Sequence, residues 1–124
     1  MNIAVDKVNI AAKFETFDAH WSPKVVGQID DYEIKLVKLA GDFVWHKHDD
    51  CDEMFLVVDG HMEIDFKDSS VALDAGEFVV VPRGVEHMPR ADSECRVMLF
   101  ERAGVTNTGD AEQSPLTVRQ PERI

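Results

Sequence analysis

The chain has 124 residues, and 24 acidic side chains against 13 basic ones give it a formal net charge of −11 with the histidines neutral. This length suits one domain, and a composition with 44% hydrophobic and 30% charged residues excludes a disordered or collagen-like chain. The longest apolar run, residues 54–58, is far shorter than the roughly 20 residues that a membrane helix needs. Because the negative charge repels phosphates, we expect neither nucleic acid nor a membrane as partner.

The start of the chain and its cysteines indicate the compartment. The first residues lack the cationic start, apolar stretch and small-residue cleavage site of a secretory signal, so we expect a cytoplasmic protein. Cys51 and Cys95 are too few for a disulfide framework and show no C-x-x-C spacing. Free thiols are the expectation in that compartment.

Residues 1–23 form the first of three predicted parts, an N-terminal helical or extended segment. It holds the only plausible helix, which Asn9 would cap and which would end before Ser22-Pro23. The apolar side chains at helical spacing are Ile10, Phe14 and Phe17.

The second part, residues 24–102, is rich in Val, Ile and Phe in short runs separated by turn residues, which predicts a β-barrel. Met62, Ile64 and Phe66 alternate with polar residues and so share one face. Asp59-Gly60 is a hairpin signal, and Ala75-Gly76 and Arg83-Gly84 mark two further turns. The predicted strands are residues 32–39, 43–47, 53–58, 61–66, 71–73, 78–81 and 95–101.

The third part, residues 103–124, is polar and contains Pro115 and Pro121. We expect an extended C-terminal tail that is either mobile or laid along the barrel or a partner subunit. Strands with so little helix must close into a barrel or form a sandwich to hide their edges, so the fold class is all-β.

Three histidines and one glutamate stand out as candidate metal ligands. His46 and His48, two residues apart on a predicted strand, point the same way, and Glu53 opens the next strand beside them. A second segment ends in a Pro-x-Gly turn and returns with His87. Three imidazoles and one carboxylate suit a divalent transition metal such as Fe, Mn, Ni, Co or Zn, and they leave coordination positions open.

The spacing of these residues resembles the cupin superfamily. The first cupin motif is written G-x5-H-x-H-x3or4-E-x6-G, and the chain reads G-x4-H-x-H-x4-E-x6-G from Gly41 to Gly60. The second motif, G-x5-P-x-G-x2-H-x3-N, is matched from Gly76 to His87, with Ala91 in place of the final Asn. The resemblance covers about residues 32–101, and the flanking stretches at 20–25 and 103–109 look like small bacterial cupins labelled mannose-6-phosphate-isomerase-like.

The resemblance implies a double-stranded β-helix, or jelly-roll barrel, with His46, His48, Glu53 and His87 as ligands of one divalent metal ion. If Glu53 points inward, alternation turns Phe55 and Val57 inward too, which makes the cavity wall apolar. Alternation also turns Met54, Leu56 and Val58 outward. Because those side chains are apolar and need cover, we expect a homodimer.

Other polar residues near the motifs have plainer interpretations beside functional ones. Asp49, Asp50 and Asp52 attract cations to the site or form a solvated loop, and Cys51 is a fifth ligand, a redox sensor or an inert thiol. Alternation turns Glu86 away from the metal. The arginines that could bind a substrate carboxylate or simply be solvated are Arg83, Arg90 and Arg96. No residue is identified as a general base.

The sequence leaves two classes of function open. The first is a metal-dependent enzyme of dioxygenase, decarboxylase, isomerase or lyase type that acts on a small, partly apolar organic molecule. The second is a non-catalytic cupin that binds or senses a small molecule in the same cavity. A metal-free, epimerase-like cupin is disfavoured because all the ligand types are present.

Overall fold

The computed structural model describes residues 5–124. Helix α1 (Ile10–Phe14) begins after Asn9, whose side-chain oxygen accepts a hydrogen bond from the Ala12 N–H at 3.0 Å, as predicted. The helix is shorter than predicted and ends well before Ser22-Pro23. Thr16 explains the early end, because its hydroxyl donates to the Lys13 carbonyl and competes with the helical pattern. The first four residues of the predicted segment 1–23 lie outside the described residues.

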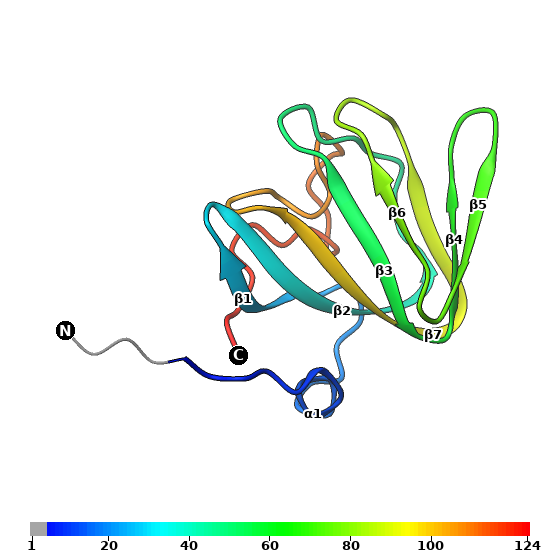
Figure 1. Cartoon of the computed structure of the whole chain (residues 1–124). Helices are drawn as coiled ribbons and strands as arrows, with labels where there is room; N and C mark the ends of the chain where they lie inside the picture. The colour runs from blue at the N-terminus through cyan, green and yellow to red at the C-terminus, as the bar shows by residue number, and fades with distance from the viewer. Residues whose placement is uncertain (1–4) are drawn as a thin grey trace.

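Seven strands form an antiparallel sheet that curls into a barrel, which confirms the all-β jelly roll (Figure 1). The hydrogen-bonded order is β1-β2-β7-β3-β6, and β4 pairs with β5 and β7. Side chains of these strands fill the barrel with apolar residues, including Phe55, Val57, Met62 and Ile64. The strands are β1 (Lys24–Ile29), β2 (Tyr32–Asp42), β3 (Glu53–Asp59), β4 (His61–Asp65), β5 (Ser70–Asp74), β6 (Phe78–Val81) and β7 (Met88–Arg102).

One predicted strand is wrong, and one strand was not predicted. Residues 43–47 are not a strand: the β2–β7 ladder stops at Asp42, because Phe43 faces Pro89, which accepts a hydrogen bond but has no N–H to return. β1 was not predicted because Gly27 interrupts its apolar run, and the β1–β2 register shifts next to that glycine. A glycine inside a strand is typical of such an irregularity.

The predicted hairpin at Asp59-Gly60 is also wrong. β3 and β4 do not pair with each other, because both run along the same edge of β7: Val57 lies opposite Val97, and Glu63 lies opposite Arg90. Residues 53–65 therefore run along β7 as one continuous extended segment, which bends at Gly60. We call this segment the bent β3–β4 path. Glycine is required there because φ is +100° and a Cβ would lie 3.2 Å from the Cys95 Cα. The turns at Gly76 and Gly84 are as predicted.

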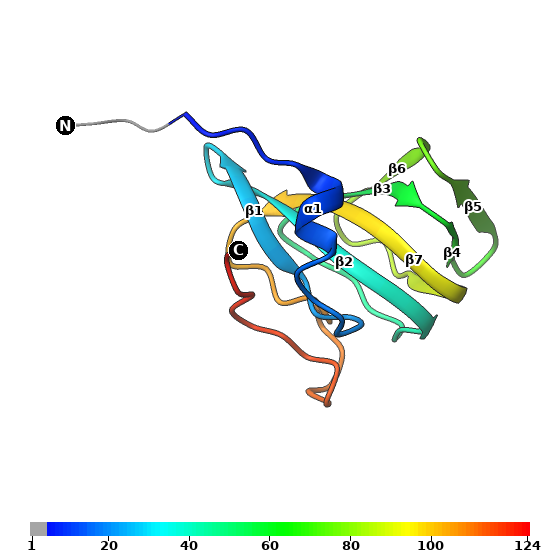
Figure 2. The same ribbon diagram turned by 90° about the horizontal axis from the view of Figure 1, so that it is seen from below.

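The two ends of the chain lie on the barrel surface. α1 lies on the outer face of β2 (Figure 2), where Phe14 and Leu36 are fully buried. Of the two arrangements expected for the C-terminal tail, mobile or docked, the structure shows the docked one: the tail lies along the barrel of its own chain. Near its end, the Val25 N–H donates to the Glu122 carbonyl at 2.8 Å, and the Ile124 N–H donates to the Val25 carbonyl at 3.0 Å. Within residues 5–124 no helix is long and apolar enough to cross a membrane.

Candidate metal centre

The two histidine segments face each other as a short bridge. The His46 N–H donates to the His87 carbonyl at 3.0 Å, and the His87 N–H donates to the His46 carbonyl at 2.9 Å. The segment around His46 stays extended although it is not a strand, so side chains two residues apart still point the same way. His46 and His48 are thereby turned into the barrel together. Glu53 enters from the start of β3.

The four side chains converge on one point. The ligand atoms of His46, His48, Glu53 and His87 all lie within 4.8 Å of one another, and all four side chains are buried. The Glu53 Oε1 atom is 3.4 Å from the Nε2 atoms of both His48 and His87. Within residues 5–124 these three atoms are buried without a hydrogen-bond partner. Buried polar atoms without partners are costly, and a metal ion between them would satisfy all three.

Two of the imidazoles are held by their outer nitrogens. The His46 Nδ1 atom lies 2.9 Å from the Val44 carbonyl, and the His87 Nδ1 atom lies 2.9 Å from the Val85 carbonyl. A carbonyl oxygen can only accept a hydrogen bond, so each Nδ1 carries the hydrogen and each Nε2 presents its lone pair to the centre. This is the tautomer that a metal-binding histidine needs.

The charge state of the group suits a cation. Burial, together with the neighbouring His87, lowers the pKa of His46 to about 4, so its ring is neutral near pH 7. Burial raises the pKa of Glu53, but the adjacent imidazoles of His48 and His87 outweigh burial and hold this pKa below its ordinary value. Neutral imidazole and ionised carboxylate are the forms that bind metals. The chain therefore holds a buried His/His/Glu/His cluster that can bind a metal ion.

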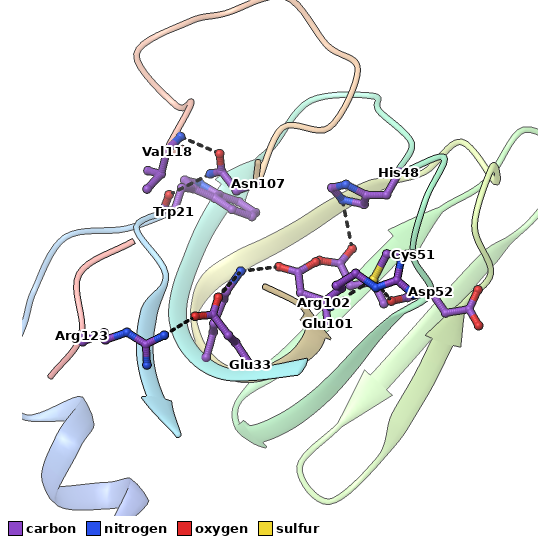
Figure 3. Close-up of polar contacts among 12 residues, drawn as sticks. Trp21, Glu33, His48, Cys51, Asp52, Glu101, Arg102, Asn107, Val118 and Arg123 are labelled. Carbon is purple, nitrogen blue, oxygen red and sulfur yellow. Dashed lines mark hydrogen bonds and ion pairs between the residues drawn. The ribbon is translucent and has the colours of Figure 1, made fainter. Parts of the chain in front are cut away.

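A row of buried charged residues lies next to the cluster, and it was not predicted from the sequence. Lys35, 2% exposed, donates to Glu101 at 3.0 Å and lies 3.8 Å from Glu33, which Arg123 of the tail binds at 2.7 Å (Figure 3). Burial, together with the charge of Glu53, raises the pKa of Glu101 well above its ordinary value. The only sequence signal is alternation along β2, which puts Glu33 and Lys35 on the same side as Val37 and Leu39.

Two cavities flank the cluster. A small one of about 30 Å³ is touched by His46 and Glu53, and apolar side chains such as Phe43, Phe55 and Leu99 line most of the rest of it. A larger one of about 630 Å³ is touched by His48 and lined by charged residues, among them Lys47 and Arg102. A metal held by the cluster would therefore lie next to both an apolar cavity and a polar one.

Most of the other candidate residues lie outside the cluster. Glu86 is exposed and pairs with Lys67 at 3.2 Å, as alternation predicted. Arg90 pairs with Glu63 and Asp65, and Arg96 pairs with Glu15; neither lines one of these two cavities. Arg83 lines the larger cavity beside Asp49, Asp50 and Cys51.

The contacts of Cys51 disfavour both metal binding and redox chemistry by its thiol. Its thiol is 1% exposed, donates to the Asp52 carbonyl and accepts from the Arg102 N–H. Burial raises its pKa, which disfavours the reactive thiolate. Cys95 is likewise buried and unpaired.

Comparison with known proteins agrees with the fold. Residues 35–101 match the cupin domain family. An uncharacterized protein of Bacillus subtilis, YdbB, is 36% identical over 67 residues, and this match spans 53% of the present chain but only 59% of YdbB.

Two solved structures are also similar. A cupin-2 domain containing protein of Shewanella frigidimarina is 48% identical, with a TM-score of 0.76 over 77% of this chain and 93% of that one. Protein NMB1881 of Neisseria meningitidis is 32% identical, with a TM-score of 0.72 over 79% of this chain and 100% of that one. The bent β3–β4 path, the paired histidine segments and these matches lead to one conclusion: the chain belongs to the cupin family.

Proposed function

We propose that the protein binds one divalent transition-metal ion, Fe, Mn, Ni, Co or Zn, through His46, His48, Glu53 and His87. The observation that carries the proposal is the set of buried ligand atoms that face one another without hydrogen-bond partners among the described residues. When bound, the metal would supply a Lewis acid, or a centre that activates dioxygen, at its open coordination positions.

The residues around the cluster would select a small, partly apolar organic molecule. The apolar cavity admits only a group of roughly the size of a methyl, because Trp21 stacks on Phe43 at 4.6 Å between ring centroids and helps to enclose it. The polar part of such a molecule would lie toward the larger cavity, beside Lys47 and Arg83. On this basis we favour a metal-dependent enzyme of dioxygenase, decarboxylase, isomerase or lyase type.

One observation favours the alternative, a non-catalytic cupin that binds or senses a small molecule. The only titratable side chains that line the apolar cavity, among residues 5–124, are His46 and Glu53. Both are assigned to the metal, so this cavity has no separate general acid or base. Turnover of any candidate by the metal-loaded protein would favour the enzyme, whereas binding without turnover across a broad panel would favour the sensor.

The metal proposal is tested by elemental analysis of untagged protein purified without chelator. We expect about one equivalent of metal per chain in the wild type, and its loss in the double variant His48→Ala, His87→Ala. The matched control is His20→Ala, His61→Ala, which removes two exposed histidines that pair with Glu94 and Asp74 outside the cluster. Absence of metal from the wild type even after reconstitution would refute the proposal.

We further propose a homodimer formed through the outer sheet face. In register across four strands lie Ile34, Phe100, Met54 and Val80, and beside them Leu36, Met98, Leu56 and Phe78. α1 packs against β2 at one side of this surface, where Leu36 is fully buried, while Phe78 remains 59% and Val80 48% exposed. Flat apolar rows of this kind fit a second copy of the same face around a two-fold axis.

The dimer is tested by light scattering after size-exclusion chromatography. We expect wild-type protein at twice the chain mass of 14.0 kDa, and Phe78→Glu, Val80→Glu at the monomer mass. Val85→Glu is the control, since Val85 is 36% exposed in the turn between β6 and β7, outside these rows. A monomeric wild type would contradict the proposal.

The division of the chain and its location are also proposed. The start of β1 at Lys24 and the end of β7 at Arg102 support residues 24–102 as the cupin barrel, with residues 1–23 and 103–124 attached to it. The two free thiols support a cytoplasmic protein.

A further inference from the structure

The part of the tail that follows β7 crosses over the segment that carries two of the histidines. We call residues 103–118 the C-terminal strap. The Lys47 N–H donates to the Asp110 carboxylate at 2.8 Å, and the Asp110 N–H donates to the Lys47 carbonyl at 3.2 Å. Both backbone polar groups of Lys47 are thus bound by one residue of the strap.

Gly109 allows this close approach. Its φ is +54°, and a Cβ at this position would overlap the Lys47 carbonyl oxygen and lie 3.1 Å from the His46 ring. The strap backbone therefore packs directly on the histidine segment, with no room for a side chain between them.

The strap is a preformed structure of its own. The Asn107 side chain accepts from the Val118 N–H at 2.6 Å (Figure 3), and it donates to the Leu116 carbonyl at 2.9 Å. Thr108 is 1% exposed, and its hydroxyl meets that of Thr117 at 3.1 Å. The internal bonds hold Asp110 in place before any metal arrives, which is what a positioning residue requires.

The histidine segment depends on such support because no strand ladder runs through it. One side of the segment is held by the His46–His87 bridge and by the Gly84 N–H, which donates to the His48 carbonyl at 2.8 Å. The other side is held by the strap. Lys47 stands between two proposed ligands, so a rotation of its peptide groups would move both imidazoles.

We propose that Asp110 and Gly109 are positioning residues of the metal centre, which fix the spacing of the His46 and His48 imidazoles through the Lys47 backbone. The inference rests on the proposed metal function. It concerns a segment outside residues 35–101, the part of the chain that matches the cupin family.

The test measures the dissociation constant for Co²⁺ by competition with a chelator, together with the visible absorption spectrum of the bound ion. In Asp110→Ala, which loses the acceptor, we expect the constant to rise about tenfold or more and the spectrum to shift. Asp110→Asn keeps an acceptor oxygen and should restore both values. Gly109→Ala should behave like Asp110→Ala.

Two control variants separate positioning from general effects. Gly104→Ala also places a side chain at a positive φ, +87°, in the strap, but no atom lies within 4 Å of the new Cβ. Asp49→Ala removes a carboxylate that pairs with the Lys47 ammonium at 3.4 Å but leaves the Lys47 backbone bonds intact. Both controls should keep the wild-type constant and spectrum. Thermal unfolding of each metal-free variant confirms that it is folded.

The outcomes distinguish the inference from the metal function itself. If the wild type binds no Co²⁺, the proposed metal function fails. If the wild type binds and Asp110→Ala shows the same constant and spectrum, the strap only covers the barrel and the inference is overturned. Equal weakening in Asp110→Ala and Asp49→Ala would also overturn it, because charge alone would then explain the effect.

Discussion

Lys35 is a cation inside the barrel, held between Glu101 and Glu33 and 2% exposed. Replacing it with Met would leave Glu101 buried without its cationic partner, whereas Glu33 would keep Arg123. We expect Lys35→Met to lower the free energy of unfolding by about 3–5 kcal/mol, measured by urea denaturation. The double variant Lys35→Met, Glu101→Leu should recover much of this loss. A single variant as stable as the wild type would show that the lysine contributes nothing.

A second prediction about single residues concerns the reactivity of the two thiols, Cys51 and Cys95. Burial raises the pKa of Cys95 to about 11 and also raises that of Cys51. Because a thiolate is the reactive form and both thiols are inaccessible, the native protein should give no reaction with a disulfide reagent at pH 8. Both should react after unfolding in urea. Rapid reaction of one thiol in the native protein would restore the redox-sensor interpretation of Cys51.

Single residues also show which parts of the site can be predicted. His46, His48, Glu53 and His87 stand at spacings that the sequence displays directly, and the structure brings the four together. Whether they bind a metal stays a prediction. Asp110 was not predicted, because its partner Lys47 is 63 residues away and a bond from a side chain to a backbone group leaves no pattern in the sequence.

Among the elements, the bend between β3 and β4 makes the clearest prediction. Gly60→Ala must combine backbone strain at φ +100° with a Cβ 3.2 Å from the Cys95 Cα and the Glu94 carbonyl oxygen. Gly76→Ala, at φ +86°, meets no neighbouring atom and so measures the strain alone. We expect about 1–2 kcal/mol of destabilisation at Gly76 and about 1–3 kcal/mol more at Gly60, by urea denaturation. Equal destabilisation of the two variants would mean that the atoms around Gly60 move aside at little cost in free energy.

Alternation and turn residues predicted β3 to β6 well, because those strands are short and their inward sides are apolar. Pairing partners were harder to predict. Asp59-Gly60 has the residues of a hairpin, yet both flanking strands pair with β7, whose residues 88–94 are too polar to suggest a strand. A turn residue predicts the local backbone conformation, but it does not predict which strand the following residues pair with.

For the whole molecule, the last residues of the tail tie the barrel together at β1. Arg123 binds Glu33 at 2.7 Å and Gln28 at 3.1 Å, and the neighbouring Ile124 bonds to Val25. Truncation after Gln120 would remove these contacts and leave the buried Glu33 without its arginine. We expect a loss of about 2–4 kcal/mol in thermal unfolding, with Co²⁺ affinity retained because the strap remains. Arg119→Ala, which removes only a bond to Gln113 at the surface, is the control.

The place of β7 in the chain has a consequence for synthesis on the ribosome. β2, β3 and β4 all pair with β7, which is the last strand to leave the exit tunnel. Until residues 88–102 emerge, the apolar strands made earlier have open edges and only local partners such as β1 with β2 or β4 with β5. Stalled nascent chains that end before Met88 should therefore be captured by chaperones or aggregate, and a mature barrel should appear only after the final strand is released.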